Sequence, residues 1–442
     1  MKAKAIILGL LMGSGCLAGP AAAEQLADHS TGYAKAGARA VQISLQLAIE
    51  RGSKRSPELA PSRAATRASK RSQRASEQAL SSPPRLELAA GPRLGADRGL
   101  DASVGLWQDI PLAGIGASRQ RAAQAMALAA RFQLQDAELQ AALAAGLAWV
   151  DARAARELLS IRLKGQRAAE QVAQFTAARL AEGAATAGEM ALARSLVGSA
   201  KAQVLDAEGR LFSAHVELAY CLGMDEERAL DAVGRLDQDG VKISEARAFA
   251  SLKRSPRLRQ LAAEAQVARA AAEQSRAEGS PQLSVGPSLT REGTGDWIVL
   301  GRVSFPLPVV NPKALETAEH LRAAAVANAR WGRMSRRLKR ALHLLFHERE
   351  HARTTRDALA TGAVEPARVA HREALSKYSS GKSNLGEVHV AQRNLLDAEE
   401  RWLLAAADAR ASELRLLAVT GDLRRPLVPA ARRTENPSKA RP

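Results

Sequence analysis

The chain has few aromatic side chains and almost no cysteine. Among its 442 residues, 3% are Phe, Trp or Tyr, and the two cysteines are Cys16 and Cys221. So few aromatic residues exclude a large aromatic core, and the abundance of Ala, Leu, Arg and Glu favours long helices packed through small side chains. Cys16 falls within an expected leader, so Cys221 would be left without an intramolecular disulfide partner.

Long hydrophobic runs are missing as well. After the first 23 residues, no run approaches the roughly 20 apolar residues of a membrane-spanning helix. The start itself has Lys2 and Lys4, an apolar run over residues 5–12 and small residues up to Ala23, a layout typical of a secretory signal peptide. We therefore predict a signal peptide over residues 1–23. Residues 13–16 also resemble a lipoprotein box that lacks its usual Leu, so lipidation of Cys16 is an open alternative to cleavage after Ala23.

Acidic residues are outnumbered, and the formal net charge is +18. One basic cluster has no acidic complement within its own helix; it consists of Arg51, Lys54, Arg55, Arg63, Arg67, Lys70, Arg71 and Arg74. It can be a solvated helix face, the lining of a tunnel that favours anionic solutes, or a surface against acidic helices of other copies. Because a leader is present and nucleic-acid-binding motifs are missing, we expect no nucleic-acid partner.

One turn sequence occurs twice. Residues 183–189 read Gly-Ala-Ala-Thr-Ala-Gly-Glu, and residues 381–387 read Gly-Lys-Ser-Asn-Leu-Gly-Glu. In each copy a Gly suits the left-handed end of one helix, the Thr or Asn suits the cap of the next, and the Glu three places later suits a capping box. Both copies are therefore predicted to be tips of helical hairpins, with the candidate tip residues Gly183, Thr186, Gly188, Glu189, Gly381, Ser383, Asn384, Gly386 and Glu387.

The two tips occupy matching places in two similar halves, which predicts an internal two-fold repeat. The first half covers residues 24–240 and the second covers 241–423; each contains a helix, a strand hairpin (84–112 and 281–308) and a long helical hairpin. The proline-free stretch 118–180 predicts a helix of about 90 Å. The stretch 312–377 is interrupted by Gly332, Gly362 and Pro366, and a kink is expected near Pro366. The tail, 424–442, is predicted to be disordered.

The expected fold class is mainly α with a small β part. Four strands cannot close a barrel, and open strand edges are not tolerated in lipid. Three copies would supply twelve strands, which is enough for closure. The simplest solution is a trimeric 12-stranded barrel attached to long antiparallel helical hairpins.

The second tip resembles the outer-membrane efflux protein family, the TolC-like channels of tripartite pumps. Its similarity lies in Lys377-Tyr378, Gly381, Asn384, Glu387 and Ala391-Gln392, whereas the first tip has Arg194 where the Gln would stand. The resemblance spans residues 41–423. Residues 303–308 with Asn311 also look like the heavy-metal and cation subgroup, but the continuation from Pro312 departs from that subgroup's pattern.

The resemblance implies a passive homotrimeric conduit in the cell outer membrane, extending into the periplasm as a helical tunnel. Its partners would be outer-membrane lipid, a periplasmic adaptor (membrane fusion) protein and an inner-membrane transporter, with both tips as the adaptor-docking ends. The exported solutes would be metal cations or drugs. The resemblance implies neither an enzyme nor a cofactor.

Two other interpretations compete with a channel. His347 and His351 with Glu348 match the zinc-protease motif, and His343 adds a third imidazole on the same helix face. This ladder can be a solvated helix face, a transient site for a divalent cation or, least favoured, a protease centre. A secreted coiled-coil adhesin or scaffold would explain the leader and the helices, but it has no use for two strand hairpins at matching places.

Overall fold

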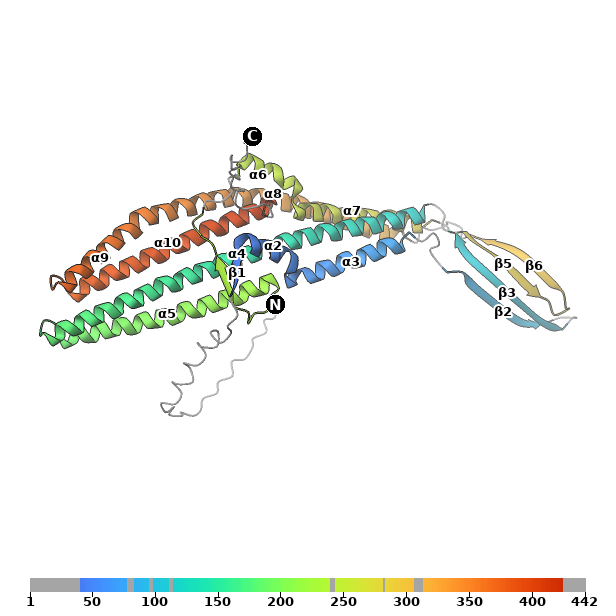
Figure 1. Ribbon diagram of the computed structural model, residues 1–442. Coiled ribbons are helices and arrows are strands. Elements are labelled where there is room, and N and C mark those ends of the chain that lie inside the picture. Colours follow the sequence, from blue (N-terminus) through green and yellow to red (C-terminus); the bar gives the residue numbers. More distant parts are fainter. Residues whose placement is uncertain are drawn as a thin grey trace, which may run out of the picture.

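The computed structural model describes residues 40–77, 83–94, 98–110, 114–238, 243–280, 283–305 and 313–423. The expected signal peptide, residues 1–23, and the expected disordered tail, residues 424–442, lie outside them. The molecule is elongated, with a β-sheet at one end and the tips of two helical hairpins at the other (Figure 1). The prediction of a mainly α fold with a small β part is confirmed.

Two long helical hairpins form most of the molecule. The first joins α4 (Ile115–Ala181) to α5 (Ala187–Leu222). The second joins α8 (Ala314–Leu359), a π-helical turn (Ala360–Val364) and α9 (Glu365–Ser379) to α10 (Leu385–Thr420). At 1.5 Å per residue, α4 alone extends about 100 Å. Small residues allow close packing: a Cβ on Gly165 of α4 would lie 3.0 Å from Leu396 Cδ1 of α10.

The kink expected near Pro366 is confirmed as a π-helical turn. Pro366 stands in the first turn of α9, directly after Ala360–Val364. Proline lacks the backbone N–H, and its ring crowds the carbonyl four residues earlier, which belongs to Gly362. Widening the preceding turn to π geometry relieves that conflict. Gly332, by contrast, lies inside α8 without interrupting it.

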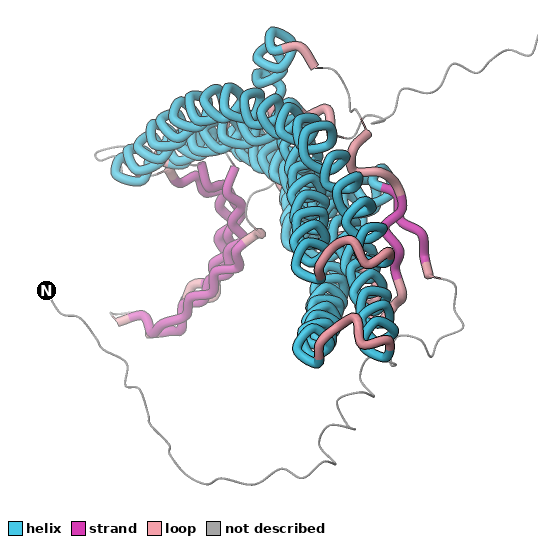
Figure 2. Tube along the Cα trace, turned by 90° about the vertical axis from the view of Figure 1, so that its left-hand side faces the viewer, coloured by secondary structure: helices cyan, strands magenta, loops and turns pink. Residues whose placement is uncertain are grey.

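Shorter helices complete a curved layer. They are α2 (Leu45–Arg55), a 3-10 turn (Pro57–Leu59), α3 (Ala60–Ala75), α6 (Glu245–Ser251), a second 3-10 turn (Leu252–Arg254) and α7 (Pro256–Glu278). Near the sheet the packing order is α3–α4–α7–α8, and near the tips it is α5–α4–α10 followed by α8 and α9. Figure 2 shows this layer end-on, with its helices following an arc. No described helix has a stretch long and apolar enough to cross a membrane.

A small parallel strand pair at mid-length was not expected. β1 (Val41–Ser44) pairs with β4 (Leu230–Val233), directly before the start of α2. The Ser44 side chain accepts a hydrogen bond from the Leu47 amide and caps α2, so the residues before it are free to extend. Ile43 is fully buried there, and Trp149 Nε1 donates to its carbonyl oxygen at 2.7 Å. The pair thereby ties both chain segments to the main core.

The sheet consists of the two expected hairpins. Its strands are β2 (Arg85–Arg93), β3 (Gly99–Ile110), β5 (Leu283–Arg291) and β6 (Trp297–Ser304), all antiparallel in the order β2-β3-β5-β6. Leu88 pairs with Val104, Val104 with Leu289, and Leu289 with Val299. Within the described residues, β2 and β6 have a strand on only one side.

Candidate functional site

The first hairpin tip is built by its own sequence. Gly183 has φ +73°, and the amides of Gly183 and Ala184 donate back to the Leu180 and Arg179 carbonyls, which closes α4 with a Schellman motif. Thr186 then starts α5 with a complete capping box. The Glu189 amide donates to Thr186 Oγ1 at 3.1 Å, and the Thr186 amide donates to Glu189 Oε2 at 2.8 Å. The predicted turn is confirmed at this tip.

The second tip repeats the turn with one difference. Gly381 has φ +75°, and Asn384 Oδ1 accepts from the Glu387 amide at 3.0 Å. The Glu387 carboxylate does not bond to the Asn384 backbone amide; it accepts from Ser383 Oγ at 2.6 Å and from Asn384 Nδ2 at 3.3 Å. Only half of the expected capping box is therefore present, because two side-chain donors occupy the carboxylate. A Cβ on Gly386 would lie 3.2 Å from the capping oxygen, which explains a glycine there.

The two tips contact each other through side chains that the tip prediction did not include. Tyr378 is fully buried, and its hydroxyl lies 2.7 Å from Thr176 Oγ1 of α4. The Arg179 guanidinium lies 4.9 Å from the Tyr378 ring centroid, and its Nη1 donates to the Ser383 carbonyl at 3.5 Å. Apolar side chains, including Val172, surround this contact. Lys377-Tyr378 belonged to the family resemblance, but no feature of the sequence pointed to Thr176.

The tip residues themselves lie at an exposed end. Gly183, Thr186, Gly188, Asn384 and Glu387 are exposed, whereas Ser383 and Glu189 are half-buried within their caps. Gly381 and Gly386 are exposed too. The structure therefore brings all nine predicted tip residues to one end of the molecule, on two adjacent hairpins (Figure 1).

Beside the tips, a groove of about 410 Å³ runs between α5 and α10. Its lining includes Gly165 and Ala169 of α4, Leu196 of α5, and Gln392 and Leu396 of α10. Gln392 Nε2 donates to the Gly165 carbonyl at 2.9 Å, which holds the two hairpins together across the groove.

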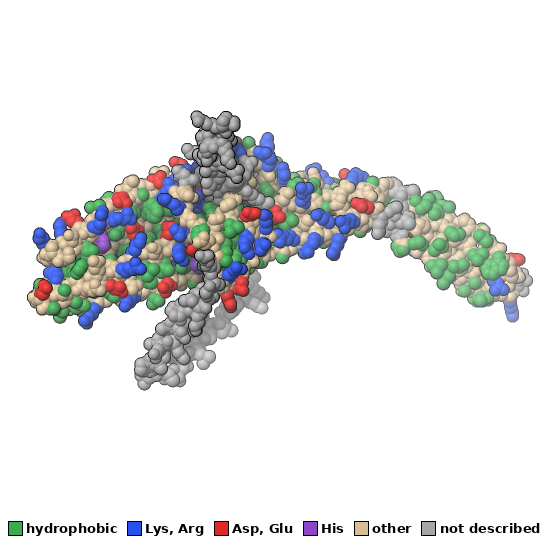
Figure 3. Space-filling model, viewed as in Figure 1, with side chains coloured by type: hydrophobic (Ala, Val, Ile, Leu, Met, Phe, Trp, Pro, Cys, Tyr) green, Lys and Arg blue, Asp and Glu red, His purple; other side chains and the backbone are tan. Residues whose placement is uncertain are grey.

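At the other end, the two faces of the sheet differ in chemistry. One face is almost wholly apolar, and among the paired strand residues that the structure describes Arg291 is the one charged residue on it. This face carries Leu86, Leu88, Leu100, Val104, Leu106, Ile110, Leu283, Val285, Leu289, Trp297, Val299 and Val303. Leu88 and Val299 are 71% and 74% exposed, so this face has no cover in the single chain. The hydrophobic surface covers most of the sheet in Figure 3, with charged side chains at its far end.

The opposite face carries mainly charges, hydroxyl groups and glycines, together with Trp107, Ile298 and Leu300. Arg85 Nη2 donates to Asp109 Oδ1 at 2.9 Å, and Ser284 Oγ donates to the same oxygen at 2.5 Å. Arg93 pairs with Asp101 at 3.3 Å and with Glu292 at 3.1 Å. These networks cross from β2 to β3 and from β3 to β5, so the sheet is polar on one side and apolar on the other.

The histidines of the ladder do not converge. The His347 and His351 rings have centroids 6.2 Å apart, while His343 lies against Phe249 and 3.8 Å from Glu245. Among the residues that the structure describes, no group of three or more His, Cys, Asp or Glu side chains is placed to hold a metal ion. The ladder lies along an exposed face of α8.

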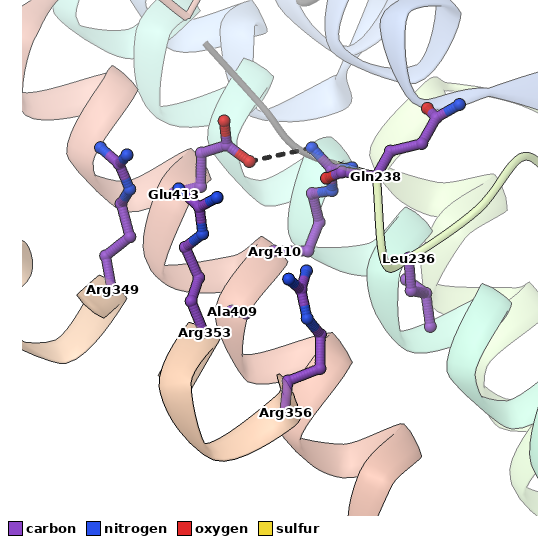
Figure 4. Close-up of a pocket in the computed structure, with 8 residues that line it drawn as sticks. All are labelled: Leu236, Gln238, Arg349, Arg353, Arg356, Ala409, Arg410 and Glu413. Atoms are coloured by element: carbon purple, nitrogen blue, oxygen red, sulfur yellow. Dashed lines mark hydrogen bonds and ion pairs between the residues drawn. The ribbon is translucent and has the colours of Figure 1, made fainter. Parts of the chain in front are cut away.

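A pocket at mid-length gathers arginines from α8 and α10 (Figure 4). Arg410 is buried; it pairs with Glu413 at 2.9 Å and donates to the Gln238 carbonyl at 2.6 Å. Arg356 donates to the Asp237 carbonyl at 3.2 Å. These bonds anchor the segment after β4 to both helices, so the pocket has a structural role.

Comparisons with known proteins give evidence on the fold. No model of a known protein family matches the chain, and no curated protein sequence does. Solved structures do match. The transmembrane channel protein CusC aligns with 14% identity and a TM-score of 0.70 over 88% of this chain and 95% of its own. The outer membrane protein VceC from Vibrio cholerae aligns with 16% identity and a TM-score of 0.70 over 85% and 96%.

The open state of the MtrE outer membrane channel from Neisseria gonorrhoeae aligns with 20% identity and a TM-score of 0.67 over 86% of this chain and 89% of its own. At such identities the likeness concerns the fold. It covers 85% or more of this chain in each of the three comparisons. The chain therefore has the TolC-like fold of these outer-membrane channels.

Proposed function

We propose that the protein is the outer-membrane channel of a tripartite efflux system, a passive homotrimeric conduit that exports small solutes. It would sit in the outer membrane and extend into the periplasm. The observation that carries the proposal is the sheet, which is apolar and exposed on one face, mainly polar on the other, and without a strand partner at either edge among the residues that the structure describes. The likeness to outer-membrane channels supports it.

The sheet supports assembly from several copies, and we propose three. An unpaired edge within lipid leaves backbone N–H and C=O groups without partners, at several kcal/mol per group. β2 and β6 run in opposite directions, because each successive pair in β2-β3-β5-β6 is antiparallel. The β6 edge of one copy can therefore continue antiparallel pairing with the β2 edge of the next. Three copies would give twelve strands, an even number, with the apolar face toward lipid.

The hairpin tips support a docking role. They form the exposed end farthest from the sheet, and each is rigidified by its own cap and by the Tyr378 contact. We propose that they meet a periplasmic adaptor protein, which would join the channel to an inner-membrane transporter. The repeated order of helix, strand hairpin and helical hairpin supports the proposed halves, residues 24–240 and 241–423.

The protein would do no chemistry of its own. The zinc-protease interpretation lacks a third ligand among the described residues near His347 and His351. A secreted scaffold without a pore would not account for the apolar face of the sheet, which is exposed in the single chain. Metal cations and drugs are both retained as candidate solutes.

Three measurements test the proposal together. The full chain should be found in the outer-membrane fraction, run on gels as a trimer that heating converts to monomer, and open pores of stable conductance in planar bilayers. Deleting the gene should lower tolerance to metals, dyes or detergents. A monomer that stays out of membranes and conducts no ions would refute the channel.

A further inference from the structure

Two arrays of basic residues lie on the two open edges of the helical layer. The α3 array consists of Arg63, Arg67, Lys70, Arg71 and Arg74, and no Asp or Glu occurs between residues 60 and 75. The α8 array consists of Arg322, Arg330, Arg333, Arg336, Arg337, Lys339 and Arg340, and no Asp or Glu occurs between residues 320 and 347. Arg63 is half-buried and bonds to the Lys54 carbonyl, whereas the other basic residues are exposed.

These side chains take no part in the ion pairs that the described residues form. Salt bridges elsewhere in the helices are numerous, such as Arg121 with Glu273 at 2.8 Å and Arg162 with Glu400 at 2.5 Å. Within the part of the chain that the structure describes, none of these salt bridges involves a residue of either array. Lys and Arg side chains are visible over the helices next to the sheet in Figure 3, where acidic side chains are fewer.

The two arrays overlap in part along the length of the layer. On α3, Thr66 Oγ1 donates to the Ala130 carbonyl of α4 at 3.2 Å. On α8, Met334 shares a groove with Asp136 of α4. Ala130 and Asp136 are about 9 Å apart along α4, so the tip-side part of the α3 array, near Arg67, lies level with the sheet-side part of the α8 array, near Arg330.

The packing order decides what the arrays face in a ring. Near the sheet the helices follow the order α3–α4–α7–α8, so α3 and α8 are the two edges. In a ring of identical copies, each α3 edge meets the α8 edge of the next copy, because a cyclic contact joins two different surfaces. Packed helices lie 8–10 Å apart, about the Debye length at physiological ionic strength. The two arrays would therefore repel each other across the contact.

The edges nearer the tips are different. On α5, Arg194, Lys201 and Arg210 are accompanied by Glu189, Asp206, Glu208 and Glu217. On α9, Arg368, Arg372 and Lys377 are accompanied by Glu365 and Glu373. The excess of positive charge is therefore confined to the contact next to the sheet.

We propose that the contact between α3 and α8 of neighbouring copies binds multivalent oxyanions of the phosphate class, which bridge the two arrays. An arginine guanidinium can donate two parallel hydrogen bonds to the oxygens of one phosphate group. An anion bound between the α3 array and the α8 array would therefore attract both arrays and offset their mutual repulsion. This inference rests on the proposed trimer. The occupant is a soluble anion and not a lipid headgroup, because Arg330, at the level where the two arrays overlap, lies about 24 Å along α8 from Ala314 at the sheet end.

The test uses full-length trimers in detergent and sodium tripolyphosphate as the probe, compared with sodium chloride at equal ionic strength. Tripolyphosphate should raise the temperature of trimer dissociation by several degrees, since it binds the assembled state. A variant carrying R67Q, K70Q, R71Q and R74Q should lose this response and dissociate at a higher temperature in chloride. A second variant, with R330Q, R333Q and R337Q, removes charge from the α8 array and should also lose the response to tripolyphosphate. The control variant, with R194Q and K201Q on α5, should respond like the native protein.

The outcomes are separable. Trimers that conduct ions but show no response to tripolyphosphate would overturn the anion bridge and leave the channel intact. Loss of the response in the α5 control, or an unchanged response in both array variants, would also overturn it. So would binding to phosphatidylglycerol vesicles by trimers that ignore tripolyphosphate, because the anion source would then be lipid. A chain that is monomeric in every buffer would remove the proposed channel as well.

Discussion

The two faces of the sheet can be tested with neighbouring residues. Leu88 and Ala89 are adjacent on β2 and both exposed in the single chain, but their side chains point to opposite faces. Leu88 lies on the apolar face, opposite Val104, and Ala89 lies on the polar face, opposite Ser103. The proposed channel places Leu88 against lipid and Ala89 against water.

Arginine at a lipid-facing position near the bilayer midplane costs about 2–4 kcal/mol per strand. Leu88 lies near the middle of β2, so Leu88→Arg should cost about 6–12 kcal/mol per trimer if three copies contribute equally. Ala89→Arg introduces the same side chain into a water-filled interior, where the guanidinium stays hydrated, so its cost should be much smaller. The difference in trimer stability between the two variants, rather than either value alone, shows which face of the sheet contacts lipid.

The assay compares the two variants in outer-membrane fractions and in urea titrations of trimers in lipid vesicles. Leu88→Arg should yield little inserted trimer and a lowered urea midpoint, whereas Ala89→Arg should insert normally and change the conductance. Equal insertion of both variants would refute the assignment of the apolar face to lipid. Failure of Ala89→Arg alone would mean that the faces are reversed.

Three further changes have defined outcomes. Thr186→Ala removes the first capping box and should lower the stability of the α5 start by about 1 kcal/mol, seen as faster amide exchange at residues 187–190. Tyr378→Phe removes the hydroxyl that donates to Thr176, whose own hydroxyl already donates to the Val172 carbonyl at 2.8 Å, and should cost about 1 kcal/mol in urea unfolding. Burial raises the pKa of Asp136 despite the nearby Arg257, so native stability should fall as pH rises from about 3.8 through the raised value; Asp136→Asn should flatten this slope and leave stability at pH 7 equal or higher.

The tips show how far local sequence reaches. A tight turn between two helices needs a left-handed residue after the first helix, an N-cap residue before the second, and a carboxylate three residues later that accepts from the N-cap amide. Gly183, Thr186 and Glu189 supply all three within seven residues, so this turn is specified locally. At the second tip the same reasoning predicts one hydrogen bond that does not form, from the Asn384 amide to the Glu387 carboxylate. The side chains of Ser383 and Asn384 donate to that carboxylate instead. The docking role of the tips is not a local property and is still a proposal.

The strand pair at mid-length shows the opposite case. Residues 41–44 form a strand because Leu230–Val233 lie beside them and Trp149 binds the Ile43 carbonyl, contacts that join residues far apart in the chain. Such a pair cannot be predicted from the periodicity of the sequence, because four residues are too few to show a clear alternation of apolar and polar side chains.

The sequence by itself determined the long helices, the two strand hairpins, the repeated turns and the kink before Pro366, because each depends on hydrogen bonds or steric conflicts within a few residues. Only the tertiary structure decided that α4 is shared by both ends of the layer, that Tyr378 joins the two tips, and that the α3 and α8 arrays lie on opposite edges and overlap in part along the layer. Those features depend on which helices pack together, and that choice is made by buried surfaces distributed over the whole chain.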